Sequence, residues 1–223
     1  MPNDERVERL LAGGVIAILR LATADDLLPV AEAIREGGVT AIEFTLTTPG
    51  AIRALEPARE KLGGGVLLGG GTVLTAGAAR EAIAAGAEYV VAPNVNPAVV
   101  EVCRGRNVPV VPGAFTPTEI VQAWDLGASL VKVFPVGSVG PRYIKDLRGP
   151  LPHIPLVPTG GVSLENVEAF IKAGAAAVGV GGEMVPKEFL ARREFGEITK
   201  RARQFADAVA RARPASDRWA SSG

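Results

Sequence analysis

Short apolar runs rich in β-branched residues alternate along the whole chain with longer segments of helical pattern. Each run is only a few residues long, so together they predict eight strands: VIAIL, AIEFTL, VLLGGGTV, YVVAP, VPVVPGA, SLVKVFP, PLVPTGG and AVGVGG. Such alternation is typical of a parallel sheet covered by helices. Eight units without a linker predict a closed (β/α)8 TIM barrel of the α/β class, with an open doubly wound sheet as the alternative.

The sequence predicts a single domain that takes in all of residues 1–223. The barrel is expected over about 14–185, followed by a C-terminal helix over about 187–213. The tail, 214–223, is polar and rich in small residues, and we expect it to fray. An additional N-terminal helix is expected before the first strand, where the segment MPNDERVERLL is charged and amphipathic.

The charge balance limits the kinds of partner. Lysine plus arginine and aspartate plus glutamate both number 24, which favours a small-molecule partner over nucleic acid or an anionic membrane surface. No stretch approaches the ~20 apolar residues of a membrane-spanning helix, and the N-terminal segment lacks the basic start and apolar run of a signal peptide. The single cysteine, Cys103, excludes an intramolecular disulfide, so we expect a buried thiol in a cytoplasmic protein.

A glycine separates four of the predicted helices from the strand that follows, at Gly38, Gly86, Gly127 and Gly174. These glycines stand in the segments EGGVTAIEF, AAGAEYVVA, DLGASLVKV and KAGAAAVGV. Glycine is favoured at a helix C-terminus because the chain takes a left-handed conformation there before the next element begins. The recurrence indicates one regularly wound architecture.

Two charged residues interrupt apolar strands at equivalent positions, Glu43 and Lys132, each five residues after one of these glycines. A buried ammonium or carboxylate is costly unless it is paired, neutralised or used. Alternate residues of a strand share a face, so Lys132 is expected to lie with Leu130 and Phe134, and Glu43 with Thr45. Both charges are therefore predicted to point into the barrel.

Further polar residues collect where the predicted strands end. Arg20 follows VIAIL, Thr72 follows GGG and Asn94 follows VVAP. Active sites of (β/α)8 barrels are built at this end, from several strands at once. A buried Lys–Glu pair also occurs as a structural salt bridge, but the convergence of Arg20 and Thr72 on the same end favours a catalytic site.

The chemistry that suits a buried lysine is attack on a carbonyl. Desolvation lowers the pKa of an amine from ~10.4 toward neutrality, and the neutral amine forms a Schiff base that accepts electrons when a neighbouring carbon bond breaks. Glu43 is then suited to shuttle protons. No metal or cofactor is expected, because the only histidine, His153, lies in the proline-rich loop PLPHIP, where ligation is disfavoured.

The last two predicted strands end in glycine-rich turns, PTGGV at 158–162 and GVGGEMV at 179–185. Glycines let backbone N–H groups approach an anion closely, and the loops after strands seven and eight are the usual phosphate position in these barrels. The alternative is that these glycines only form tight turns. A phosphorylated small-molecule substrate is the favoured hypothesis.

Taken together, the motifs resemble the class I aldolase family of 2-keto-3-deoxy-6-phosphogluconate (KDPG) aldolase and 4-hydroxy-2-oxoglutarate aldolase, which also includes the phosphogalactonate enzyme. The matching stretches run in unbroken order from about Gly14 to Val185: IAILR, IEFTLTTP, GGGTV, the APN turn, VPGAFTPTE, LVKVFP, GPRYIKDLRGPLP, PTGGV and VGVGG. Any one of these would be a weak signal, whereas the ordered set covers nearly the whole chain.

The resemblance implies a role for each matching residue. Lys132 is similar to the Schiff-base lysine of the family, and Glu43 to its general acid/base. The other positions implied are the carboxylate-binding residues Arg20 and Thr72, the pocket residues Thr45, Pro93 and Phe134, and the phosphate-binding glycines Gly160, Gly161, Gly181 and Gly182. The family also implies a homotrimer.

The chain departs from the family pattern at two places. Some members have an arginine where this chain has Thr47, so carboxylate binding is expected to depend more on Arg20. Many have a serine where this chain has Gly182, and the acidic Glu183 follows it, which is expected to weaken phosphate binding.

The resemblance implies reversible cleavage of KDPG to pyruvate and glyceraldehyde 3-phosphate. The alternatives within the class are 4-hydroxy-2-oxoglutarate and the phosphogalactonate analogue of KDPG as substrates. Those outside it are a phosphosugar isomerase barrel, which would not need a lysine in mid-strand, and a non-catalytic trimeric scaffold.

Overall fold

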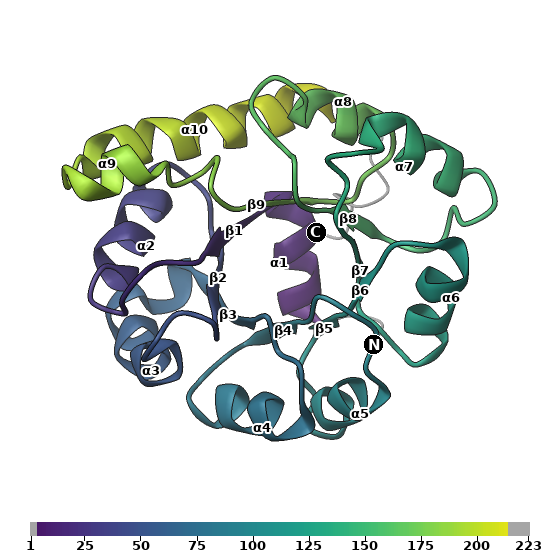
Figure 1. The fold of residues 1–223 in the computed structure, drawn as a ribbon, viewed down its shortest axis with the longest axis horizontal. Helices are drawn as coiled ribbons and strands as arrows, with labels where there is room; N and C mark the ends of the chain where they lie inside the picture. The colour runs from purple at the N-terminus through teal and green to yellow at the C-terminus, as the bar shows by residue number, and fades with distance from the viewer. Residues whose placement is uncertain (1–3, 214–223) are drawn as a thin grey trace.

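The computed structural model describes residues 4–213. Figure 1 shows the strands around the centre of the molecule with the helices outside them, so the predicted α/β class with a parallel sheet is confirmed. The strands are β1 (Val15–Leu19), β2 (Ala41–Thr45), β3 (Leu67–Gly71), β4 (Tyr89–Val91), β5 (Val110–Val111), β6 (Gly113–Ala114), β7 (Val131–Val133), β8 (Leu156–Pro158) and β9 (Val178–Val180).

Most strands are followed by a helix. The helices are α1 (Glu5–Gly13), α2 (Leu27–Glu36), α3 (Ala51–Leu62), α4 (Ala76–Ala84), α5 (Pro97–Gly105), α6 (Pro117–Asp125), α7 (Gly140–Arg148), α8 (Val167–Lys172), α9 (Lys187–Ala191) and α10 (Phe195–Ala212), with a short 3-10 helix at Gly63–Gly65. No helix within residues 4–213 is long and apolar enough to cross a lipid bilayer.

The strands pair in parallel in two sheets. Six strands follow the order β5-β4-β3-β2-β1-β9, and three follow the order β6-β7-β8. In the larger sheet Glu43 of β2 lies between Ile18 of β1 and Gly69 of β3. In the smaller sheet Lys132 lies between Gly113 of β6 and Val157 of β8. The two charged residues therefore occupy the middle strands of different sheets.

The two faces of each strand pack against different partners. Val131 and Val133 of β7 belong to the large apolar cluster between strands and helices. Leu130 belongs to a separate cluster inside the ring, that is, the circle of strands in Figure 1. The same inner cluster contains Leu10 of α1. Helix α1 crosses the centre of the ring in Figure 1, so it covers one end of the interior with apolar side chains. This end of the interior is packed, and a site has room only at the other end.

The predicted helix over about 187–213 is wrong in one respect, because the structure has two helices there, α9 and α10. Between them Arg193 has a φ of 53°, in the left-handed region, which a continuous right-handed helix does not allow. Helix α10 then packs on α2 and α8. The predicted frayed tail, 214–223, lies outside the described residues.

The four glycines expected to end helices adopt the predicted conformation. Their φ angles are 92° at Gly38, 100° at Gly86, 99° at Gly127 and 96° at Gly174. Left-handed backbone is costly for residues with a Cβ atom, which accounts for glycine at each turn from helix to strand.

Replacing Gly38 with alanine tests this account. A Cβ at Gly38 would meet no atom within 4 Å, so Gly38→Ala should lower the free energy of unfolding only through backbone strain, by about 1–2 kcal/mol. The matched control is Gly64→Ala, at a glycine that also has open space but no positive φ, where no loss is expected. Equal effects in urea unfolding would contradict the assignment.

Candidate active site

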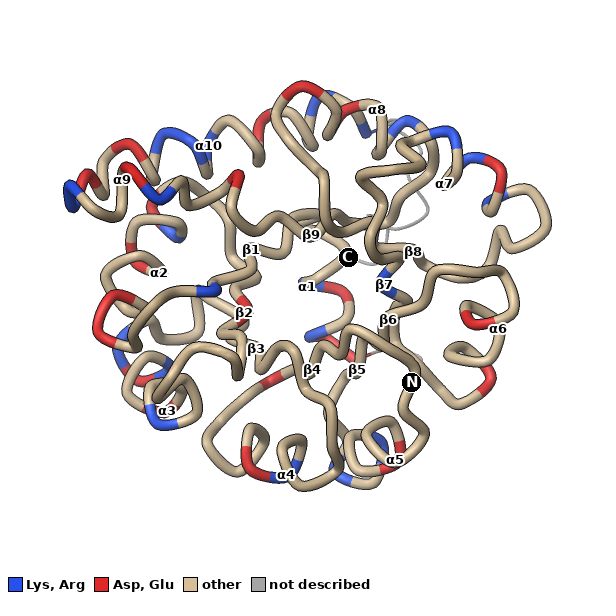
Figure 2. The backbone as a smooth tube through the Cα atoms, in the orientation of Figure 1, with Lys and Arg blue, Asp and Glu red and all other residues tan. Residues whose placement is uncertain are grey.

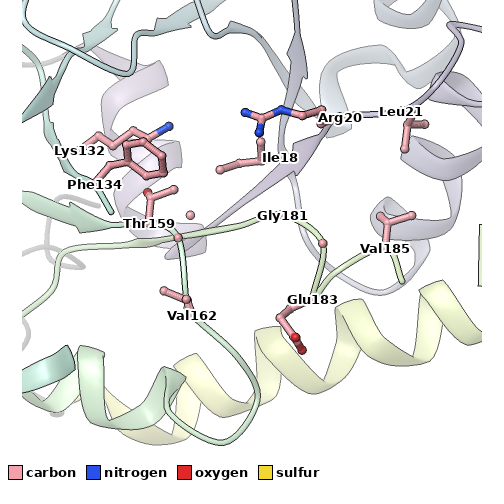
Figure 3. Close-up of a pocket in the computed structure, with 14 residues that line it drawn as sticks. Ile18, Arg20, Leu21, Lys132, Phe134, Thr159, Val162, Gly181, Glu183 and Val185 are labelled. Atoms are coloured by element: carbon pink, nitrogen blue, oxygen red, sulfur yellow. The ribbon is translucent and has the colours of Figure 1, made fainter. Parts of the chain in front are cut away.

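A cavity of about 310 Å³ opens at the C-terminal ends of β1, β7, β8 and β9. Figure 3 shows the side chains that surround it: Lys132 and Phe134 lie on one side, Ile18 and Arg20 on the other, and the turn around Gly181 lies beneath them. This is the end of the strands where the sequence predicts a site. The strands thus place the Arg20 guanidinium, the Lys132 amine and two glycine turns around one cavity.

Lys132 projects from the middle of β7, and its side chain reaches toward Arg20 across the cavity in Figure 3. The residue is only 6% exposed, and its Nζ lies 5.0 Å from the centre of the Phe134 ring. Burial lowers the pKa of the Lys132 amine, and the positive charge of Arg20 lowers it further, whereas Glu43 acts in the opposite direction. Desolvation is the largest of these effects, so the site shifts Lys132 toward its neutral, nucleophilic form.

Glu43 lies deeper, and its carboxylate does not line the cavity. Both carboxylate oxygens are buried without a hydrogen-bond partner among residues 4–213. A Cβ atom at Gly71 of β3 would lie 1.7 Å from Glu43 Oε1, so glycine at 71 makes the space that the carboxylate fills. Burial raises the pKa of Glu43, while the nearby charges of Lys132 and Arg20 lower it.

The pKa values of Lys132 and Glu43 are shifted in opposite directions by the same cause, burial. Burial raises the pKa of Glu43 and lowers that of Lys132, so the two pKa values lie closer together than in water and a proton passes more easily between the two groups. A carboxyl group of raised pKa near an amine of lowered pKa is suited to general acid/base catalysis. A nucleophile and a proton shuttle are therefore present together.

Arg20 differs from Lys132 because it is exposed and makes no hydrogen bond or ion pair with the rest of residues 4–213. Its guanidinium group points into the cavity in Figure 3. A guanidinium ion presents donors in a fork that matches a carboxylate. Arg20 is thus free to bind an anion beside Lys132.

Two glycine turns form another part of the cavity wall, apart from Arg20. They are Gly160–Gly161 after β8 and Gly181–Gly182 after β9. The first turn is fixed by Asn166, whose side-chain Nδ2 donates to the carbonyl oxygen of Gly161 at 2.8 Å. The second is closed by a backbone hydrogen bond from Met184 N–H to the carbonyl oxygen of Gly181 at 2.8 Å. These turns bring backbone to the cavity wall without side chains.

Glu183 follows the second turn, but its carboxylate points away from the cavity, toward helix α10, in Figure 3. Arg201 of α10 pairs with it, with 2.7 Å between Arg201 Nη2 and Glu183 Oε2. Arg201 Nε also donates to the carbonyl oxygen of Glu183. The negative charge beside the glycine turn is therefore neutralised and turned outward.

Three residues expected at the pocket do not line the cavity: Thr45, Thr72 and Pro93. Thr45 is fully buried, and its hydroxyl group donates to the carbonyl oxygen of Leu19 at 3.0 Å. Pro93 contacts the backbone of the neighbouring strand, because a Cβ at Gly113 would lie 2.4 Å from its carbonyl carbon. Thr72 has a φ of 58°, an unusual conformation for a β-branched residue that is often found near functional sites.

Several lining residues were missed by the sequence analysis, namely Ile18, Leu21, Thr159, Val162 and Val185. Thr159 is the most informative, because it lies directly after β8, the neighbour of β7. Its place in PTGG, between a predicted strand and two glycines, is the sequence signal that points to it. The apolar lining residues carry no signal that separates them from the core.

Two groups considered in the sequence take no part in the cavity. Cys103 is buried in α5, and burial raises the pKa of its thiol to about 12, so the thiolate is not available near neutral pH. His153 is exposed, and its ring centre lies 6.2 Å from that of Trp124.

The pH dependence of Lys132 tests the electrostatics of the site. Competitive labelling with trace acetic anhydride, read by peptide mass spectrometry, should give Lys132 a pKa below the ordinary ~10.4 of lysine. Glu43→Gln should lower this pKa further, because it removes the carboxylate that favours the ammonium form. The exposed Lys61 serves as the internal reference for the reagent. A higher pKa for Lys132 in Glu43→Gln would refute the coupling.

Comparison with known proteins agrees with this chemistry. A protein-family model described as KDPG and KHG aldolase matches residues 7–201. The 2-dehydro-3-deoxy-phosphogluconate aldolase of Treponema pallidum (strain Nichols) is 37% identical over 191 residues, which cover 85% of this chain and 90% of that protein. The 2-dehydro-3-deoxy-6-phosphogalactonate aldolase of Escherichia coli (strain K12) is 34% identical over 171 residues, covering 76% and 83%.

A solved structure extends the likeness to the fold. The KDPG aldolase of Legionella pneumophila, with pyruvate captured as a covalent carbinolamine intermediate, superimposes with a TM-score of 0.83 at 30% identity. The match covers 90% of this chain and 97% of that one. This chain therefore belongs to the KDPG and KHG aldolase family and is a class I aldolase that acts through a Schiff base.

Proposed function

We propose that this aldolase cleaves 2-keto-3-deoxy-6-phosphogluconate reversibly to pyruvate and glyceraldehyde 3-phosphate. The observation that carries the proposal is the buried amine of Lys132, which opens on a cavity with a free guanidinium group on one side and two glycine turns on another. An acidic group at each end of the substrate, with a ketone between, fits this arrangement. A phosphosugar isomerase would leave the mid-strand lysine without a function.

The mechanism begins with attack of the neutral Lys132 amine on the C2 ketone, which gives a carbinolamine. Protonation of the carbinolamine hydroxyl group, with Glu43 as the source of the proton, expels water and forms the iminium ion. The Glu43 carboxylate left by that step takes the proton of the C4 hydroxyl group, and the C3–C4 bond breaks. The electron pair of this bond moves to the iminium, which becomes an enamine as the aldehyde leaves. Protonation of the enamine at C3 and hydrolysis release pyruvate and restore the amine.

Arg20 is proposed to hold the substrate carboxylate beside C2. The guanidinium has no hydrogen-bond or ion-pair partner within residues 4–213, so a carboxylate would satisfy it without breaking any interaction described there. Thr47 stands where some members of the family have an arginine, and its hydroxyl oxygen lies 3.1 Å from that of Thr45. Carboxylate binding therefore depends mainly on Arg20, and fixing the carboxylate positions C2 for attack by the amine. Thr72 stays a predicted contributor, and Thr45 and Pro93 are proposed to support the pocket from behind it.

The phosphate is proposed to bind at Gly160, Gly161, Gly181 and Gly182. Small residues allow backbone N–H groups to approach an anion, and this is the phosphate position of many barrels. The expected repulsion from Glu183 is reduced, because Arg201 pairs with its carboxylate and the side chain points away from the cavity.

The alternative substrates within the class are 4-hydroxy-2-oxoglutarate and the phosphogalactonate analogue. All three present a carboxylate and a ketone to Arg20 and Lys132, so these residues do not discriminate among them. They differ at the far end and in the configuration at C4, and a comparison of kcat/KM for the three substrates distinguishes them.

We also propose that the two sheets form one closed (β/α)8 barrel with an additional N-terminal helix, in a single domain. Backbone hydrogen bonds join the two sheets at both of their edges. Ser129 N–H, just before β7, donates to the Val110 carbonyl of β5, and Ala176 N–H, just before β9, donates to the Leu156 carbonyl of β8, each at 2.9 Å. Strands β5 and β6 are separated only by Pro112, which lacks the N–H needed to continue the ladder, so they count as one strand.

A homotrimer and a cytoplasmic location stay predictions, and a mass measurement in solution tests the homotrimer.

Reductive trapping tests residue, mechanism and substrate class together. Borohydride added with pyruvate should convert the iminium into a stable secondary amine on the peptide that contains Lys132. Lys132→Met should form no adduct and lose activity by roughly 10³-fold or more, whereas Lys61→Met, at an exposed lysine, should behave like the unmodified protein. An adduct on another peptide, or none with folded protein, would reject the proposed function.

Arg201→Ala tests the role of the glycine turn after β9. Loss of the guanidinium leaves the Glu183 carboxylate without its ion-pair partner, so its negative charge repels the substrate phosphate. KM for KDPG should rise by about fivefold, which corresponds to about 1 kcal/mol, the interaction of two unit charges 4 Å apart in water. The affinity for pyruvate, which lacks the distal phosphate, should not change. Arg211→Ala is the matched control, because Arg211 lies on α10 like Arg201 and forms a similar ion pair with Glu168 of α8, at 3.1 Å. An unchanged KM in Arg201→Ala would contradict this role.

A further inference from the structure

A tyrosine hydroxyl group is buried in the interior near the catalytic carboxyl group, and the mechanism above makes no use of it. Tyr89, the first residue of β4, is fully buried, and its hydroxyl group has no hydrogen-bond partner within residues 4–213. The two oxygens of Glu43 are buried and unpartnered as well. Buried polar groups are nearly always paired, so a donor and an acceptor that are both unpaired in one interior require an explanation.

The strand register brings the two residues together. Glu43 of β2 and Tyr89 of β4 both pair with Gly69 of β3, so they belong to the same layer of the interior on either side of a glycine. A Cβ at Gly69 would lie 2.4 Å from Tyr89 Cζ, the carbon that bears the hydroxyl group. The hydroxyl end of the ring therefore lies over β3 and is directed toward β2.

The carboxyl group of Glu43 lies over the next inward position of the same strand, because a Cβ at Gly71 would be 1.7 Å from its Oε1. Positions two apart on a strand are separated by about 6.6 Å. The phenol and the carboxyl group thus lie over successive glycines of β3. Neighbouring groups of this kind can form a hydrogen bond either directly, after a side-chain movement, or through a bridging water molecule.

We propose that Tyr89 is a positioning residue, whose hydroxyl group donates a hydrogen bond to the Glu43 carboxylate, directly or through one water molecule, and holds it for proton exchange with Lys132. The inference rests on the proposed role of Glu43. The donor acts from the closed end of the interior, so it does not compete with substrate at the open end.

The charges around the pair agree with this assignment. Arg20 after β1 and Lys132 on β7 are the charged groups that act on Glu43, and β3 contributes only glycines at the facing positions. Glu88, next to Tyr89, accepts a hydrogen bond from the Leu68 N–H at 3.1 Å and acts on the phenol electrostatically. Burial, with Glu43 and Glu88, raises the pKa of Tyr89 well above its usual value, so the hydroxyl group keeps its proton and is available as a donor.

Tyr89→Phe removes the hydroxyl group and keeps the ring. Because a hydrogen bond to the carboxylate favours its ionised form, its loss should raise the pKa of Glu43 by about one unit. The titration is followed by NMR of protein labelled with 13C at the glutamate carboxyl group, with Glu43→Gln to assign the signal. The acidic limb of kcat against pH should move upward by the same amount, and kcat should fall.

The control is Tyr143→Phe, the same change at the other tyrosine of the chain, whose hydroxyl group donates to the Phe115 carbonyl outside the ring of strands. This variant should leave the Glu43 titration in place. An unshifted Glu43 signal in Tyr89→Phe, or a fall in kcat at every pH without movement of the limb, would overturn the proposal.

A double-mutant comparison separates this inference from the proposed function. Tyr89→Phe should add no further loss in the Glu43→Gln background if it acts through Glu43, and an additive loss would refute that route. The carboxyl titration is read without substrate, so it decides the role of Tyr89 even if borohydride trapping fails. A shifted titration with no adduct would reject the aldolase mechanism and leave the Tyr89–Glu43 interaction standing.

Discussion

Removal of water from an amine and a carboxyl group is the constraint on which the rest of the structure depends. A charge in an apolar interior is costly, and a group that can give up its charge does so instead. Lys132 and Glu43 lie on strands of different sheets, so neither the sequence neighbourhood nor one strand pair brings them together. The curvature of the sheets does this, and helix α1 closes one end of the interior so that water enters only from the other.

The distribution of charge over the molecule shows how unusual this interior is. In Figure 2 most charged residues lie on the helices, including α1 at the centre of the view, whereas β2 carries one acidic residue and β7 one basic residue. Two glycines of β3 are the structural counterpart, because Gly69 leaves the room that the Tyr89 ring occupies and Gly71 the room that the Glu43 carboxylate occupies. Glycine at these positions thus leaves space for the neighbouring functional side chains.

The sequence predicts the orientation of the reactive residues well, because a strand has a period of two and the helix-ending glycines set the starting point. What it could not predict depends on contacts between distant segments. The Thr45 hydroxyl group was expected at the pocket, but the Leu19 carbonyl of a neighbouring strand accepts its hydrogen bond. Glu183 was expected to oppose an anion, yet Arg201, 18 residues later on a helix, turns its charge outward. The break between α9 and α10 has no glycine or proline to announce it, only a left-handed Arg193.

The cation at the cavity acts on the charge state of the Lys132 amine. Arg20 lowers the pKa of Lys132 and so favours the nucleophile, but it can do so only while its own charge is not cancelled. A bound carboxylate cancels that charge and, by itself, would favour the ammonium form. Glycine N–H groups at the opposite turns would hold a phosphate with dipoles, which contribute no proton to the exchange between Lys132 and Glu43. In the proposed binding mode, therefore, only the substrate carboxylate changes the electrostatic effect of Arg20 on Lys132, whereas the phosphate would be held by backbone donors that do not titrate.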